Sequence, residues 1–317
     1  MWFLIALLSP LLLGIVYFID EYLLDELNFK PITLTLFSSI VGGILAILFS
    51  VFMLSGSIVY PPEQDLYLLL FAGTSLFVVV FLYFKALDLV EASAIAPLYL
   101  TSVIFSYLLG VVFLGELISI HKILGIILIL SGALILTIKR IDVPLKDRVL
   151  STIYMVVGSL FLAVDSTIFK IVVDPKEDFF WMGTFWEHVG YLTIGIIVTL
   201  FFILNKIFTG RSKDILVGVK GSGSLAHLFS SKTLVFANLT NETLSIGSNI
   251  IINFVVLLAP VALVFTVVDG FQPLIVIFYG FILSKLRPDI FIRNGKQIQR
   301  KLAAFGLMFI GTIFILF

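Results

Sequence analysis

The stretch Leu234–Leu258, LVFANLTNETLSIGSNIIINFVVLL, carries the most information about this 317-residue chain. It is long and apolar enough to cross a bilayer as a helix. Polar residues interrupt it at spacings of four, three, four and four: Asn238, Glu242, Ser245, Asn249 and Asn253. On a helix of about 3.6 residues per turn, these spacings place all five side chains on one stripe. Because a carboxylate or a carboxamide that faces lipid is costly, the stripe must face protein or water.

Two interpretations of this polar stripe stay open. Asn and Ser side chains often hydrogen-bond neighbouring helices inside membranes, so the stripe could serve only to hold helices together. A continuous stripe that includes an acid such as Glu242 is more typical of a solute pathway. We favour the solute pathway.

The composition is that of an integral membrane protein. The chain is 60% hydrophobic with a mean hydropathy of +1.18, well above soluble domains. Its net charge of zero removes the main argument for nucleic-acid binding. We expect no metal site and no other cofactor, because the chain has no cysteine and the histidines show no ligand-like spacing: His121, His188 and His227. The first apolar run lacks a basic n-region, so we interpret it as a retained helix.

Apolar runs of membrane-spanning length recur along the whole chain with little between them. Runs of this purity are helices, because unpaired backbone groups cannot exist in hydrocarbon, and no ten-residue alternating strands are present. We therefore predict an all-α integral membrane protein with ten transmembrane helices. The runs are Trp2–Ile19, Ile32–Leu54, Leu66–Phe84, Ala92–Leu114, Ile123–Ile138, Leu150–Val173, Phe180–Leu204, Leu234–Leu258, Val261–Ile282 and Leu302–Phe317.

The ten runs divide into two five-helix repeats, residues 1–138 and 150–317, around a charged linker at 139–149. The halves echo one another weakly: Gly125 and Gly132 are seven residues apart, and so are Ala304 and Gly311. An odd number of spans makes the second unit enter the membrane the opposite way round. Such inverted repeats place solute sites near the midplane between the halves.

Basic residues indicate an orientation for these helices. The odd-numbered loops hold 17 of the 20 Lys and Arg residues. The positive-inside rule then predicts cytoplasmic odd-numbered loops and both termini outside, in a multi-pass protein of the cell membrane.

Four motifs of the first half resemble the first repeat of the EamA-like family, of the drug/metabolite transporter superfamily. They are FKALDLVEAS at residues 84–93, APL at 96–98, FLGE at 113–116 and GIILILSG at 125–132. The resemblance implies a secondary carrier of small metabolites or drugs with a central cavity between its halves. The second half departs from the pattern, with Ser284-Lys285 where the first has Gly115-Glu116. Relatives of this family are usually drawn with cytoplasmic termini, opposite to the orientation that the base count predicts.

Ionisable residues inside the predicted spans are functional candidates by default, and most lie in the second half. They are Asp165, Lys170, Glu187, His188, Glu242 and Asp269. We expect Lys170 to extend toward the nearby helix end. The neighbours Glu187 and His188 are either packing residues or a proton relay, because histidine titrates near neutrality. Gly270 and Pro273 follow Asp269, so we expect a broken helix there, close to a site.

These features together predict a secondary transporter, an exporter of small metabolites or drugs, that works by alternating access with protons as a candidate coupling ion. Glu242 and Asp269 are the first choices for binding solute or proton. Asn249 and Asn253 would supply hydrogen bonds beside Asn238 and Ser245, with Asp165, Glu187 and His188 as secondary or relay groups. The acidic residues favour a cationic or zwitterionic solute.

The alternative is a flippase of lipids or lipid-linked sugars, which would need a lateral groove and bases for phosphate. An intramembrane aspartyl protease built on Asp165 and Asp269 is not supported by the residues that follow them, so we expect no enzyme. The expected partners are a small solute, the lipid bilayer and protons, without nucleic acid. The sequence does not predict the oligomeric state.

Overall fold

A computed structural model describes residues 1–26, 29–90, 95–137, 144–174, 176, 178–209, 232–286 and 298–316. All of its regular elements are helices, which confirms the predicted all-α class. In chain order they are α1 (Trp2–Ala6), α2 (Leu8–Glu21), η1 (Tyr22–Glu26), α3 (Pro31–Phe37), η2 (Ser38–Gly42), α4 (Gly43–Met53), α5 (Glu63–Leu87), η3 (Ala96–Leu100), α7 (Thr101–Leu109), η4 (Gly110–Leu114), α8 (Ile120–Thr137), α9 (Leu145–Val173), α10 (Phe180–Thr209), α12 (Lys232–Val256), α13 (Val261–Leu286) and α14 (Ile298–Leu316).

Within the described residues, six helical stretches are long and apolar enough to cross a membrane. They are Trp2–Leu24, Pro31–Met53, Glu63–Leu87, Leu145–Val173, Phe180–Asn205 and Val261–Ile282. Three shorter apolar helices accompany them: Leu98–Leu114, Ile120–Ile135 and Ala303–Leu316. The polar α12 completes the set, so each predicted run overlaps one helical stretch. The chain is a multi-pass membrane protein, and its crossing as ten helices in two inverted repeats stays a prediction.

Prolines and charges explain where several helices begin. Proline lacks a backbone donor and has a fixed φ, so it suits a helix start, where the first N–H groups have no partner within the helix. Pro31 opens α3, Pro62 precedes α5 and Pro144 precedes α9. Glu63 lies in the first turn of α5 and Lys85 lies in its last turn, so both charges interact favourably with the helix dipole.

The helix around Asp269 is continuous, so the expected break there is wrong. The α13 helix runs through Pro273 without interruption. Prolines are tolerated inside membrane helices when neighbouring groups compensate for the lost hydrogen bond. The irregular turns lie elsewhere: η2 (Ser38–Gly42) is a π-helical turn between α3 and α4, and η3 (Ala96–Leu100) is a 3₁₀ turn before α7.

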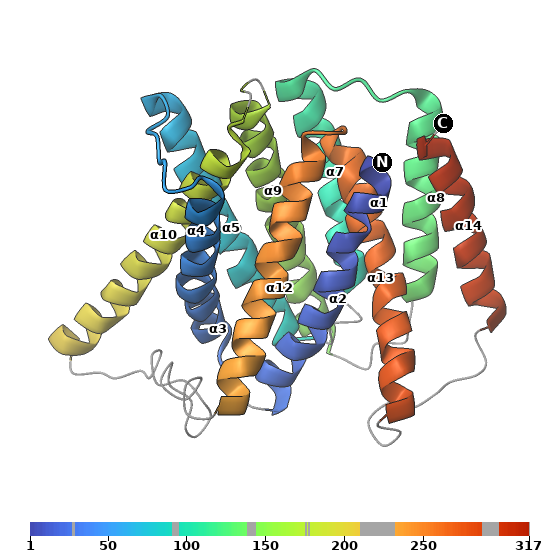
Figure 1. The fold of residues 1–317 in the computed structure, drawn as a ribbon. Helices are drawn as coiled ribbons and strands as arrows, with labels where there is room; N and C mark the ends of the chain where they lie inside the picture. Colours follow the sequence, from blue (N-terminus) through green and yellow to red (C-terminus); the bar gives the residue numbers. More distant parts are fainter. Residues whose placement is uncertain are drawn as a thin grey trace.

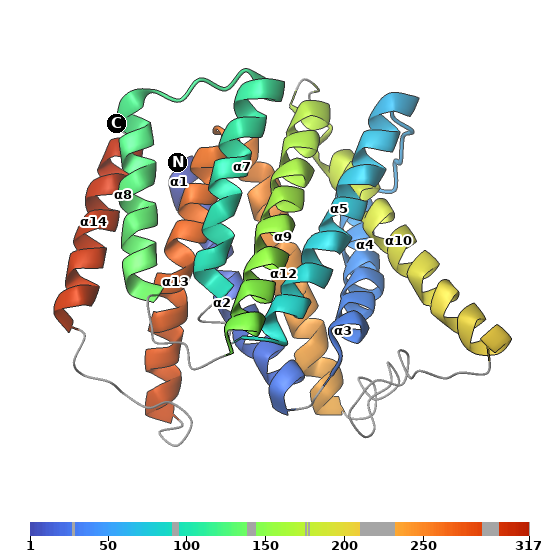
Figure 2. The ribbon, with the colours of Figure 1, turned by 180° about the vertical axis from the view of Figure 1, so that it is seen from behind.

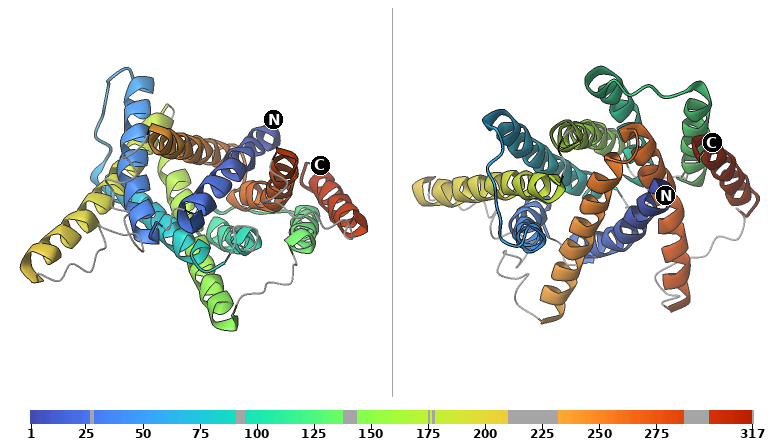
Figure 3. Two further views of the ribbon diagram at one scale, coloured as in Figure 1. Left: turned by 90° about the horizontal axis from the view of Figure 1, so that it is seen from below. Right: turned by 45° about the horizontal axis from the view of Figure 1, so that its top comes forward.

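Helices of the two halves pack against each other throughout the bundle (Figures 1 and 2). The pairs with the most extensive contact join α5 to α9 and α10, α12 to α2, and α14 to α8. The α13 helix packs on α2, α7 and α8, and its residues 261–270 are all buried. Viewed along the bundle, α10 and α14 lie at opposite edges (Figure 3).

Both termini lie at one end of the bundle, here called the upper end, at the top of Figure 1. The helices α2, α5, α8, α10 and α13 end at the opposite, lower end. Termini at the same end are what an even number of crossings produces.

The antiparallel helices α8 and α14 meet along a glycine seam, defined by Gly125, Gly132, Ala304 and Gly311 (Figures 1 and 2). A Cβ atom at Gly125 would lie 2.8 Å from the carbonyl oxygen of Gly311, and one at Gly311 would lie 2.7 Å from that of Gly125. A Cβ atom at Gly132 would lie 2.8 Å from the carbonyl oxygen of Ala304. The two seven-residue pairs that echo each other in the sequence therefore contact each other here, in reverse order.

We predict that Gly311→Ala destabilises the protein, because its new methyl group must push two backbones apart. Overpacking of this kind costs about 1–3 kcal/mol. The matched control is Gly306→Ala on the same helix, where an added Cβ meets nothing within 4 Å and only helix propensity changes. Thermal unfolding in detergent measures both variants, and equal midpoints would contradict the close contact at Gly311.

Candidate functional site

The polar stripe of α12 faces protein, as its cost in lipid requires. Asn238, Glu242 and Asn253 are almost completely buried, and Ser245 and Asn249 are half-buried. Its members nevertheless have different partners along the helix. The stripe divides into separate polar centres rather than one continuous row.

Glu242 belongs to the first centre, between α12 and the η2 turn. Ser38 donates a hydrogen bond to its Oε2 at 2.8 Å, and the Tyr191 hydroxyl donates to Ser38 Oγ at 3.0 Å. Gly42, on the same turn, leaves room for this carboxyl, because a Cβ there would lie 2.7 Å from Glu242 Oε2. The π-helical turn thus presents both a hydroxyl and an open position to the acid.

Asp20 forms a second centre that sequence analysis missed. Its Oδ2 accepts a hydrogen bond from Tyr83 at 3.0 Å and its Oδ1 accepts one from Asn241 at 2.8 Å. The side chain is 2% exposed and interacts electrostatically with Glu242. In the sequence Asp20 merely ends an apolar run, although its position three residues after Tyr17 places both on one helix face.

Three buried tyrosines from α2, α5 and η3 pack together next to Asp20. The ring centroid of Tyr17 lies 5.6 Å from that of Tyr83 and 6.5 Å from that of Tyr99. Tyr17 and Tyr99 interact electrostatically with both Asp20 and Asp269. The aromatic cluster therefore connects two carboxyl groups on different helices.

Asp269 forms the third centre, on the enclosed helix α13. Ser102 of α7 donates a hydrogen bond to its Oδ2. The neighbouring Gly270 lets α8 approach α13 closely, since a Cβ at this glycine would lie 2.6 Å from Ile129 Cγ2. Three residues after Asp269, the buried Gln272 amide has no hydrogen-bond partner among the described residues.

Asp165, Glu187 and Asn253 form the fourth centre, where α9, α10 and α12 pack together. All three side chains are fully buried. Asn253 Nδ2 donates to Glu187 Oε2 at 2.8 Å and lies 3.4 Å from Asn249 Oδ1. Asp165 interacts electrostatically with Glu187. A Cβ at Gly73 would lie 1.8 Å from the Glu187 carbonyl oxygen, so α5 holds the backbone of this acid closely.

Two of the predicted site residues make mainly local contacts. His188 Nδ1 lies 2.9 Å from the Thr184 carbonyl oxygen on its own helix and 3.9 Å from Glu187 Oε2. Because a carbonyl only accepts, Nδ1 carries the proton and Nε2 remains for other partners. Asn238 donates to the Leu234 carbonyl at 2.8 Å, which is also a contact within its helix.

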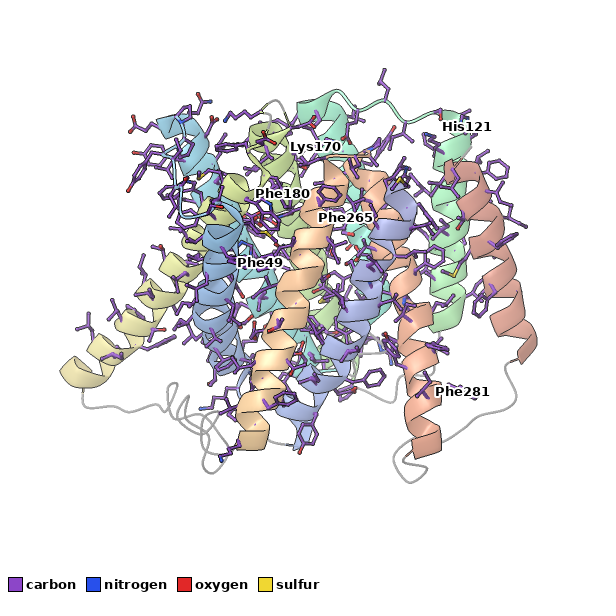
Figure 4. All side chains as sticks on the ribbon, in the orientation of Figure 1. Phe49, His121, Lys170, Phe180, Phe265 and Phe281 are labelled. Atoms are coloured by element: carbon purple, nitrogen blue, oxygen red, sulfur yellow. The ribbon has the colours of Figure 1, made fainter. Side chains whose placement is uncertain are left out.

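Lys170 does not extend to the helix end, so that expectation is wrong. It is buried near the upper end of the bundle and pairs with Glu116 Oε1 at 2.8 Å (Figure 4). Lys170 also donates to the Ala259 carbonyl at 2.9 Å, and Glu116 Oε2 accepts from the Val261 amide at 3.0 Å. This clasp of Lys170 and Glu116 secures both sides of the connection between α12 and α13.

The interior described here is therefore acidic. Five buried carboxyls face neighbouring helices: Asp20, Asp165, Glu187, Glu242 and Asp269. The buried base Lys170 is already paired with Glu116. No group of three or more His, Cys, Asp or Glu side chains suited to a metal occurs in the described part of the chain. The arrangement offers hydrogen-bond acceptors and negative charge, which suit protons or cationic groups.

Comparisons with known proteins support a transporter family. Residues 1–138 match the family described as the EamA-like transporter family. A protein named "Uncharacterized transporter in cobO 3'region", from Sinorhizobium sp, is 41% identical over 56 residues, which are 18% of this chain and 40% of that protein. A solved structure described as "Crystal structure of protein" has a TM-score of 0.61 at 15% identity, over 99% of this chain and 95% of that one. That last likeness concerns the fold alone.

We predict that Lys170→Met destabilises the protein strongly, because it leaves Glu116 buried without its ion pair. Removing one partner of a buried pair costs about 3–5 kcal/mol. The double variant Lys170→Met with Glu116→Gln should recover part of this loss. The control is Lys176→Met, which breaks a partly exposed ion pair with Asp65 and should cost at most about 1 kcal/mol. Unfolding in detergent measures all variants, and equal effects of the two single changes would contradict the clasp.

Proposed function

We propose that this chain, whose residues 1–138 match the EamA-like transporter family, is a secondary carrier of the drug/metabolite transporter superfamily, an exporter of small cationic or zwitterionic metabolites or drugs. The acidic interior carries this proposal. Its buried carboxyls lie on α2, α9, α10, α12 and α13, each within a membrane-spanning bundle. A positively charged group is the partner that such acceptors bind best.

We assign solute binding to the first three centres, those of Glu242, Asp20 and Asp269. Glu242 and Asp269 remain the first choices, and Asp20 joins them through its interaction with Glu242 and the tyrosine cluster. Rings near carboxyls suit organic cations, because an aromatic face attracts positive charge. Asn249 and Ser245 line the half-buried part of α12 between the centres.

The transport cycle that fits this architecture is alternating access between two inverted five-helix repeats, residues 1–138 and 150–317. The reversed contacts of the glycine seam support the repeat, because a two-fold axis between two such repeats would exchange Gly125 with Ala304 and Gly132 with Gly311. Rocking of one repeat against the other would expose the acids to each side in turn. The cell membrane with cytoplasmic odd-numbered loops remains the orientation that the basic residues favour.

A flippase of lipids or lipid-linked sugars is the weaker alternative. It would need free buried bases for phosphate, and in the described helices Lys170 is engaged by Glu116 and Ala259. The transporter family also suggests a protein without enzymatic activity.

We predict that Glu242→Gln and Asp269→Asn each weaken solute binding roughly tenfold or more, because each removes a charge-assisted contact worth about 1.5–3 kcal/mol. The measurement is binding, with proton release, when amines, amino acids and sugars are added to the purified protein. Matched controls are Glu63→Gln and Asp174→Asn, two exposed acids outside these centres. Unchanged binding in both site variants would reject the assignment, and no binding of any small solute by the unmodified protein would favour the flippase.

A further inference from the structure

The carboxyl group of Asp165 is the least compensated acid in the bundle. It is 0% exposed, and neither of its oxygens has a hydrogen-bond partner in the described structure. An ionised carboxylate in such a place would cost several kcal/mol. The side chain must therefore be neutral or hold a bound cation.

Neighbouring groups also leave oxygens free at this centre. Glu187 Oε1 has no partner in the described residues, although its Oε2 accepts from Asn253. The carbonyl oxygen Oδ1 of that asparagine is unpartnered as well. Two acids and an amide on three packed helices thus present buried acceptors that nothing in the described chain satisfies.

The other charged groups around α9 are already engaged. His188 on α10 donates through Nδ1 to the Thr184 carbonyl, and the same nitrogen lies 3.9 Å from Glu187 Oε2, beyond hydrogen-bond distance. The remaining pairs are Lys170 with Glu116, Asp269 of α13 with Ser102 of α7, Tyr83 of α5 with Asp20, and Asp65 of α5 with Lys176. The pair Asp165 and Glu187 therefore has two potential negative charges, and the described base beside it, His188, makes no hydrogen bond to either acid in the described structure.

We propose that Asp165 and Glu187 together bind one proton, which the carrier exchanges during its cycle at a place separate from the solute carboxyls Asp20, Glu242 and Asp269. This inference deepens the proposed function and rests on it. Two interacting carboxyls in a dry site do not both ionise, so the pair holds at least one proton, and one shared proton lowers its charge from two negative charges to one. Asn253 orients Glu187, since its amide donates to one carboxyl oxygen and leaves the other without a partner in the described residues.

The first test detects the proton directly, without transport. Infrared spectra of the purified full-length protein should contain the carbonyl absorption of a buried protonated carboxyl. This absorption should disappear or shift in Asp165→Asn and in Glu187→Gln, and remain in the control Glu63→Gln. An absorption unchanged in both site variants would overturn the proposal. Because two variants are measured, failure of one to fold leaves the other to decide, and Asn253→Ala, which should shift the absorption, provides a third.

The second test separates proton coupling from solute binding in proteoliposomes. In Asp165→Asn, exchange of labelled for unlabelled solute should continue, whereas the acceleration of uptake by a pH gradient should be lost. Loss of both activities in a folded variant would contradict a separate proton site. A gradient of sodium that replaces the pH gradient in the unmodified protein would identify a sodium site instead. If the unmodified protein exchanges no solute, the proposed function fails while the infrared test still decides the proton site.

Discussion

The cost of placing a charge in an apolar bundle without a partner governs the structure of this protein. Each polar side chain on α12 needs acceptors or donors from another helix, or from its own backbone. Glu242 accepts a hydrogen bond from Ser38. Asn241 donates one to Asp20, and Asn253 donates one to Glu187. These contacts join α12 to helices on several sides, so a polar stripe that would be unstable in lipid becomes a set of bonds that holds the bundle together.

The same contacts also connect the two halves of the chain. Ser9 Oγ lies 2.7 Å from Ser248 Oγ, and Tyr279 donates to the Leu11 carbonyl at 3.0 Å. Asp20 and Ser38, in the first half, bind residues of the second. These polar groups are therefore satisfied only when the halves are together, which makes their interface both the candidate binding region and a determinant of stability.

Much of the fold was predictable from the sequence, because apolar runs of this length leave only helices possible. The burial of the α12 stripe followed from the same argument. What periodicity cannot supply is which helices are neighbours. The sequence does not indicate that Lys170 pairs with Glu116, because Glu116 lies on a distant segment. Nor does it indicate that Ser38 binds Glu242, because the π-helical turn that carries Ser38 is not visible in the sequence. Asp20 was missed for the same reason.

The glycine seam has a consequence for how the protein is assembled. The α14 helix packs mainly on α8, and it is synthesised long after α8. Its contact with α8 thus links distant parts of the chain, the kind of pairing that forms late in folding. Until α14 emerges, the small-residue face of α8 at Gly125 and Gly132 has no close partner of its own. The α14 helix therefore completes a contact prepared in the first half, and the order of synthesis leaves this edge of the bundle open to lipid until α14 is made.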